Sequence, residues 1–95
     1  MRSESEYLAE CFWPGVGEAE LRALDERARA AAELASAEGR PVRYLGSLLM
    51  REDEVVLCLF AGSQDAVRAV AEEAEVPFER IVETDRSPWS VTESG

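Results

Sequence analysis

The chain has 95 residues, of which 46% are hydrophobic and 32% are charged. This length and composition are typical of one small globular domain rather than of a disordered chain. The formal net charge of −10 disfavours anionic partners, so we expect neither nucleic acid nor an anionic membrane surface to bind.

The sequence also favours one cellular compartment. No apolar run approaches the roughly 20 residues that a membrane-spanning helix needs. The acidic residues 1–6 lack the apolar core of a signal peptide. Cys11 and Cys58 lie in apolar segments without the spacing of a disulfide framework. We therefore expect reduced thiols in a cytoplasmic protein, with a disulfide between neighbouring strands as the alternative.

Strand and helix patterns alternate along the chain. We expect residues 1–5 to be disordered and 85–95 to form a polar tail. The period-2 and apolar segments predict strands at 7–13, 42–50, 54–61 and 78–84. Apolar residues at three- and four-residue steps predict helices at 18–38 and 64–75.

The first helical segment has an apolar stripe made of Leu21, Leu24, Ala28, Ala31 and Ala35. Asp25 and Arg29, four residues apart outside that stripe, are expected to form a surface ion pair. In the second segment, Ser63 is the expected N-cap, and the stripe consists of Val67, Val70, Ala71 and Ala74.

The order strand–helix–strand–strand–helix–strand predicts a fold. We expect an α+β, ferredoxin-like βαββαβ domain over residues 6–84, with a four-stranded antiparallel sheet and both helices on one face. In that topology the first and third strands are central. The continuous apolar run from Val55 to Phe60 falls in the third strand, as a strand buried on both faces requires.

Two helices can cover only one face of this sheet. In the third strand, Val55, Leu57 and Leu59 point to one side, and the alternate residues point to the other. Regular alternation in the second strand places Tyr44, Leu48 and Met50 on one side and Leu45 and Leu49 on the other.

Because an apolar face of this size is unusual on a monomer, we expect a homodimer of the dimeric α/β-barrel type. The alternative is a monomer whose open face is capped by the tail through Trp89.

A face between two sheets suits a small-molecule ligand. Glu10 interrupts an apolar strand on the side of Leu8 and Phe12, which makes it a weak candidate for a catalytic acid or base. Arg43 is its expected partner; a purely structural Glu10–Arg43 ion pair is the alternative. The expected ligand-binding residues are Glu10, Arg43, Tyr44, Ser47 and Tyr7, although the hydroxyl residues also fit simple core or edge positions.

The chain contains no histidine, so the commonest acid–base group and the commonest transition-metal ligand are missing. It also has no glycine-rich phosphate loop, paired-cysteine metal motif or serine elbow. We expect no metal and no cofactor.

Three segments together carry a family resemblance: Tyr7-Leu8-Ala9-Glu10 to Trp13-Pro14-Gly15, Gly39-Arg40-Pro41-Val42-Arg43-Tyr44-Leu45, and Glu52-Asp53-Glu54 to Cys58-Leu59-Phe60. In order and spacing they resemble DUF4242, a family of small bacterial domains of unknown function whose members include a nickel-binding protein. The resemblance spans residues 7–84 and implies a ferredoxin-like fold and a homodimer of the dimeric α/β-barrel kind. The nickel activity in that family rests on histidines that this chain lacks, so the resemblance implies no metal site here.

Three functions are compatible with these observations. We favour a homodimeric domain that binds a small molecule at the sheet. A cofactor-free enzyme of the cyclase, isomerase or monooxygenase type is the second, by analogy with the fold alone. The third is a purely structural or interaction module.

Overall fold

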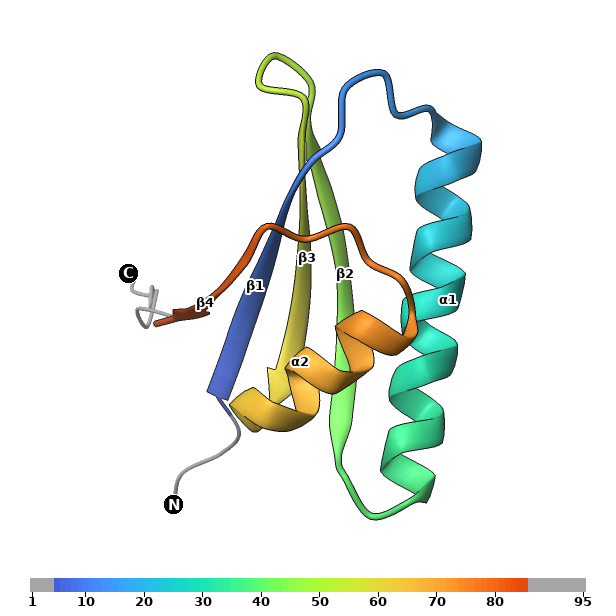
Figure 1. Ribbon diagram of the computed structural model, residues 1–95, viewed down its shortest axis with the longest axis vertical. Coiled ribbons are helices and arrows are strands. Elements are labelled where there is room, and N and C mark those ends of the chain that lie inside the picture. Colours follow the sequence, from blue (N-terminus) through green and yellow to red (C-terminus); the bar gives the residue numbers. More distant parts are fainter. Residues whose placement is uncertain (1–4, 86–95) are drawn as a thin grey trace, which may run out of the picture.

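The computed structural model describes residues 5–85 and confirms the α+β, ferredoxin-like fold (Figure 1). Its six elements are β1 (Ser5–Phe12), α1 (Glu18–Ala37), β2 (Val42–Met50), β3 (Val55–Gly62), α2 (Gln64–Glu73) and β4 (Arg80–Thr84). The predicted polar tail, with Trp89, lies outside the described residues except for Asp85. The predicted disordered N-terminus also lies outside them, except for Ser5, which begins β1.

The four strands form one sheet in the order β2-β3-β1-β4. Each neighbouring pair is antiparallel. The prediction that the first and third strands are central is therefore confirmed. The short, more polar β4 lies at an edge, where one of its sides needs no strand partner.

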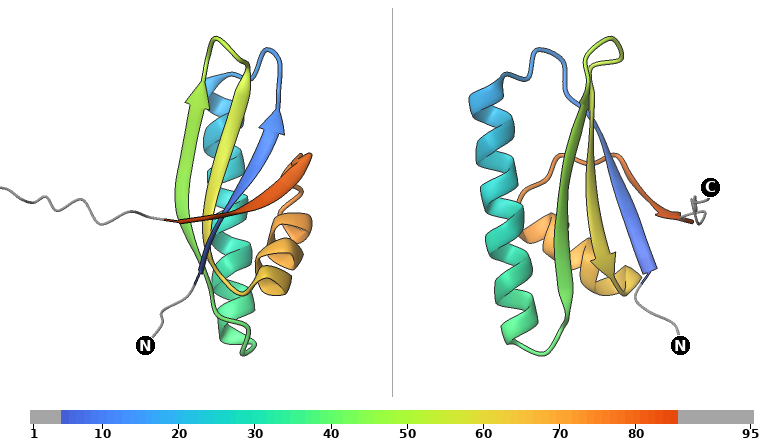
Figure 2. Two further views of the ribbon diagram at one scale, coloured as in Figure 1. Left: turned by 90° about the vertical axis from the view of Figure 1, so that its left-hand side faces the viewer. Right: turned by 180° about the vertical axis from the view of Figure 1, so that it is seen from behind.

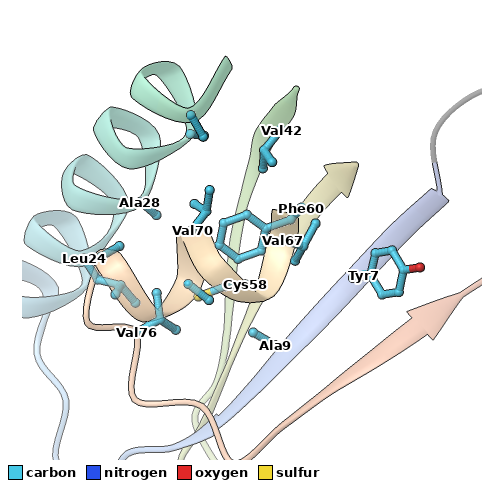
Figure 3. Close-up of a cluster of buried hydrophobic side chains, with 14 of the residues drawn as sticks. Tyr7, Ala9, Leu24, Ala28, Val42, Cys58, Phe60, Val67, Val70 and Val76 are labelled. Atoms are coloured by element: carbon cyan, nitrogen blue, oxygen red, sulfur yellow. The ribbon is translucent and has the colours of Figure 1, made fainter. Parts of the chain in front are cut away.

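Both helices lie on the same side of the sheet (Figure 2), which we call the helix side. The sheet residues buried against them include Tyr7, Ala9, Cys11, Val56, Cys58 and Phe60. The helix residues of the same cluster are Leu24, Ala28, Ala32, Ala35, Ala66, Val67, Val70 and Ala71, together with Ala74 at the C-cap of α2. Phe60 lies among these side chains in Figure 3 and is fully buried. The domain therefore has one core, between the sheet and the helices.

Local signals set the ends of the helices. The Ser63 hydroxyl accepts a hydrogen bond of 3.2 Å from the Ala66 N–H, which confirms the expected N-cap of α2. After α1, Gly39 has a φ of +91°, a conformation that glycine adopts without a steric cost. None of the helices within residues 5–85 is long and apolar enough to cross a membrane.

A β-bulge interrupts β2. Tyr44 is opposite Phe60 on β3, but the next residue of β3, Leu59, is opposite Gly46. Leu45 is therefore an extra residue, and Gly46 takes a φ of +128°.

The bulge overturns the predicted alternation in β2. Tyr44 does not share a side with Leu48 and Met50, because the extra residue shifts the pattern by one position. Tyr44 lies instead on the helix side with Ser47 and Leu49.

Candidate functional site

The side of the sheet that faces away from the helices, which we call the open face, is largely apolar. The register places on it Leu8, Phe12, Leu48, Met50, Val55, Leu57, Leu59 and Val82. Leu48 is 63% exposed, Phe12 53% and Met50 43%. A contiguous apolar surface of this kind is rare on a soluble monomer, which makes the open face the candidate binding surface.

The bulge creates a hollow in this face. The hollow has a volume of about 170 Å³ and is lined by Leu45, Gly46, Ser47, Leu48, Leu57 and Leu59. A Cβ atom added to Gly46 would meet no other atom within 4 Å. The space beside the Gly46 backbone is therefore open, and no side chain of residue 46 occupies it.

On the open face, a fork-like ion pair joins the central strand β1 to the edge strand β4. Arg80 Nε donates to Glu10 Oε1 at 2.8 Å, and Arg80 Nη2 donates to Glu10 Oε2 at 3.2 Å. The hydrogen bond from Arg80 lowers the pKa of Glu10 below its usual value. Near neutral pH, Glu10 is thus an ionised carboxylate that is already paired.

The expected pairing of Glu10 with Arg43 is wrong. Glu10 is opposite Leu57 of β3, whereas Arg43 is opposite Ala61, four residues further along that strand. Arg43 also belongs to β2, on the other side of β3 from Glu10. The structure therefore does not bring these two predicted site residues together.

The predicted hydroxyl residues lie on the helix side. Tyr44 Oη donates to Asp25 Oδ1 at 2.5 Å, and Ser47 Oγ donates to the same oxygen at 2.8 Å. Burial and the bond to Asp25 raise the pKa of Tyr44. These two hydroxyls join β2 to α1, and the buried Tyr7 also faces the helices.

Aromatic and cationic contacts hold the Tyr44 ring. Its centroid lies 5.1 Å from that of Phe60, and the Arg29 guanidinium lies over the ring at 5.7 Å from the centroid. Arg29 therefore contacts Tyr44, and Asp25, its expected ion-pair partner, accepts the two hydroxyls instead.

The sequence did not identify Asp25 or Arg80 as site residues, although both belong to these hydrogen-bond networks. Asp25 follows Leu24 at the border of the apolar stripe. This position could have indicated that its carboxylate reaches the sheet. Arg80 had no comparable signal, because its partner Glu10 is 70 residues away in the chain.

The two cysteines are free and fully buried on the helix side. Hydrogen bonding to Cys58 and burial raise the pKa of Cys11. Within residues 5–85, no three side chains of Cys, Asp or Glu are grouped so that they could hold a metal ion.

Comparisons with known proteins agree with this architecture. No curated protein matches the sequence. The crystal structure of SCO4226 from Streptomyces coelicolor A3(2) is similar, with a TM-score of 0.66 and 20% sequence identity. The similarity covers 86% of this chain and 98% of that one, which shows a shared fold. A family model described as "Nickel responsive protein SCO4226-like" matches residues 7–84. The chain therefore belongs to the SCO4226-like family.

Proposed function

We propose that the chain is one subunit of a homodimer whose two sheets meet through their open faces, and that the interior between them binds a small, uncharged molecule. The observation that carries this proposal is the exposure of large apolar side chains on the open face, above all Leu48, Phe12 and Met50. The resemblance to the DUF4242 domains implies the same kind of assembly.

The energetics favour covering this face. Withdrawing a large aliphatic or aromatic side chain from water contributes about 1.5–3 kcal/mol when it was fully exposed. Each of two subunits would contribute its own set of such side chains in a symmetric interface. The ion pair of Glu10 and Arg80 does not oppose this, because the two charges already neutralise each other through two hydrogen bonds.

The hollow at Gly46 supports the ligand part of the proposal. Four leucines form most of its lining. Its one polar side chain is Ser47, whose hydroxyl donates a hydrogen bond to Asp25 on the helix side. An ionised ligand would find no opposite charge in this lining, so the hollow favours an uncharged, apolar group. In the dimer, the second sheet would close the hollow from above.

The state of Glu10 favours binding over acid–base catalysis. A general acid needs a pKa near the working pH, whereas the pKa of Glu10 is lowered.

The free thiols of Cys11 and Cys58 support the proposed cytoplasmic location, since reduced cysteines are the rule there.

Light scattering coupled to size-exclusion chromatography tests the dimer. We expect a mass of twice the 10.5 kDa of one chain. The substitution Leu48→Glu should give a folded monomer, because it places a charge in the interface. The matched control is Leu34→Glu, which changes a leucine of similar exposure (57% against 63%) on α1, away from the open face. A wild-type mass of one chain, or equal effects of both substitutions, contradicts the dimer.

The ligand is tested with a matched pair of probes, toluene and benzoate, which differ mainly in charge. We expect toluene to shift the methyl NMR signals of Leu57 and Leu59, and benzoate to leave them in place. Leu57→Phe, which fills the hollow, should weaken the toluene effect, whereas the control Leu8→Phe, on β1 outside the lining, should not. A stable dimer without any toluene effect would favour the purely structural module.

A further inference from the structure

Nickel sites in proteins are built mainly from imidazole nitrogens and, in some cases, from thiolates. Imidazole is unavailable to this chain, since none of its 95 residues is a histidine. Any nickel site would have to be built from the two cysteines and the carboxylates.

The cysteines are unsuitable ligands. The side chains of Cys11 and Cys58 are 0% exposed and lie in the core between the sheet and the helices. A metal binds the thiolate, and hydrogen bonding to Cys58 and burial raise the pKa of Cys11, which disfavours its thiolate form. The hydrogen bond with Cys11 lowers the pKa of Cys58, so for Cys58 it is the complete burial of the side chain that opposes coordination. Coordination would require both a path into the core and the loss of apolar contacts there.

The carboxylates are numerous but are not assembled into a site. The chain has 20 Asp and Glu residues, yet within residues 5–85 no three donors are grouped as a metal requires. Two carboxylates that lie beside the sheet are already engaged, Glu10 by Arg80 and Asp25 by two hydroxyls. Carboxylates alone also suit magnesium, calcium or manganese better than nickel.

From these three observations we infer that this member of a family described as nickel-responsive does not itself coordinate nickel. The chain has the family's fold, but residues 5–85 contain no donor set for the metal. Its folding should therefore not require nickel. This inference does not rest on the proposed dimer or on its ligand.

Isothermal titration of the full chain with NiCl₂, in the presence of excess MgCl₂, tests the inference. Magnesium suppresses non-specific association with the acidic surface. We expect no saturable heat from the natural chain. Saturable binding with a defined stoichiometry that persists in magnesium would overturn the inference.

A variant of the same chain calibrates the titration. Glu26→His combined with Ala30→His places two imidazoles four residues apart on the exposed side of α1, where they can share one metal ion. We expect this variant to bind nickel at least about tenfold more tightly than the natural chain. Equal or tighter binding by the natural chain would contradict the inference.

Absorption spectroscopy adds a readout that is specific for the thiols. Nickel coordinated by Cys11 or Cys58 would produce sulfur-to-metal charge-transfer bands in the near ultraviolet. We expect no such bands and no change in melting temperature when NiCl₂ or EDTA is added. New bands that disappear in Cys11→Ser or Cys58→Ser would overturn the inference.

Discussion

At the scale of single residues, Asp25 connects the long helix α1 to the edge strand β2. One carboxylate oxygen accepts both the Tyr44 and the Ser47 hydroxyls, so a polar contact is placed beside an otherwise apolar core. A hydrogen bond to a charged group contributes more than a neutral one, because removing one partner leaves a partly buried charge less well solvated. Asp25 thus orients α1 on the sheet.

The substitution Tyr44→Phe should lower the free energy of unfolding by about 1–2 kcal/mol, because it removes one of these charge-assisted bonds. Urea denaturation measures the loss. Tyr7→Phe is the matched control, since within residues 5–85 the Tyr7 hydroxyl has no hydrogen-bond partner. Equal losses in the two variants would show that the bond to Asp25 is not the cause.

Glu10 and Arg80 form the second contact that matters at this scale. Their hydrogen bonds lower the pKa of Glu10, so the folded state favours the ionised carboxylate. A lowered folded-state pKa contributes stability that is present above the unfolded-state pKa and is lost as the pH falls through the folded-state value.

Arg80→Gln should therefore raise the pKa of Glu10 toward its usual value, as followed by the NMR signal of its side-chain carboxyl carbon. The difference in melting temperature between the natural chain and the variant should be larger at pH 7 than at pH 3. A pKa of Glu10 that does not change in Arg80→Gln would mean that another group lowers it.

At the scale of elements, the bulge in β2 has the largest consequence. One extra residue turns Tyr44 toward the helices and leaves Leu48 and Met50 on the open face. It also places Gly46 where its missing side chain opens the hollow. The same irregularity therefore builds the Asp25 contact on one side of the sheet and the candidate ligand site on the other.

Gly46→Ala should destabilise the domain by about 1 kcal/mol, because a φ of +128° is unfavourable for a residue with a Cβ atom. The new methyl group meets no neighbour within 4 Å, so the cost is one of backbone conformation rather than of a clash. Thermal unfolding measures it. An unchanged melting temperature would contradict the predicted backbone cost.

At the scale of the whole molecule, residues 5–85 form one buried core and leave the other face of the sheet uncovered. The helices cover the side of Val56, Cys58 and Phe60, and leave the side of Leu57 and Leu59 open. In the proposed homodimer, a second copy of the chain would supply an apolar face of the same size. If the chain assembles in this way, its stability is linked to its concentration.

The melting temperature of the natural chain should accordingly rise by roughly 3–5 °C for each tenfold increase in protein concentration. Differential scanning calorimetry at several concentrations measures this rise. The Leu48→Glu variant should lose the dependence, and the Leu34→Glu control should keep it. A melting temperature that is independent of concentration in the natural chain would contradict a dimer that dissociates on unfolding.

The sequence by itself determined the order of the elements, the fold class and the central place of the strand from Val55 to Gly62, because apolar periodicity and turn residues are local signals. It also predicted that the two helices would leave one face of the sheet without a cover, and it contains no histidine that could bind a metal. The tertiary structure alone decided which groups meet. The partner of Glu10 is 70 residues away, and the side on which Tyr44 lies depends on one extra residue in the pairing of β2 with β3. Such contacts depend on strand register, and the register is determined jointly by residues that are far apart in the chain.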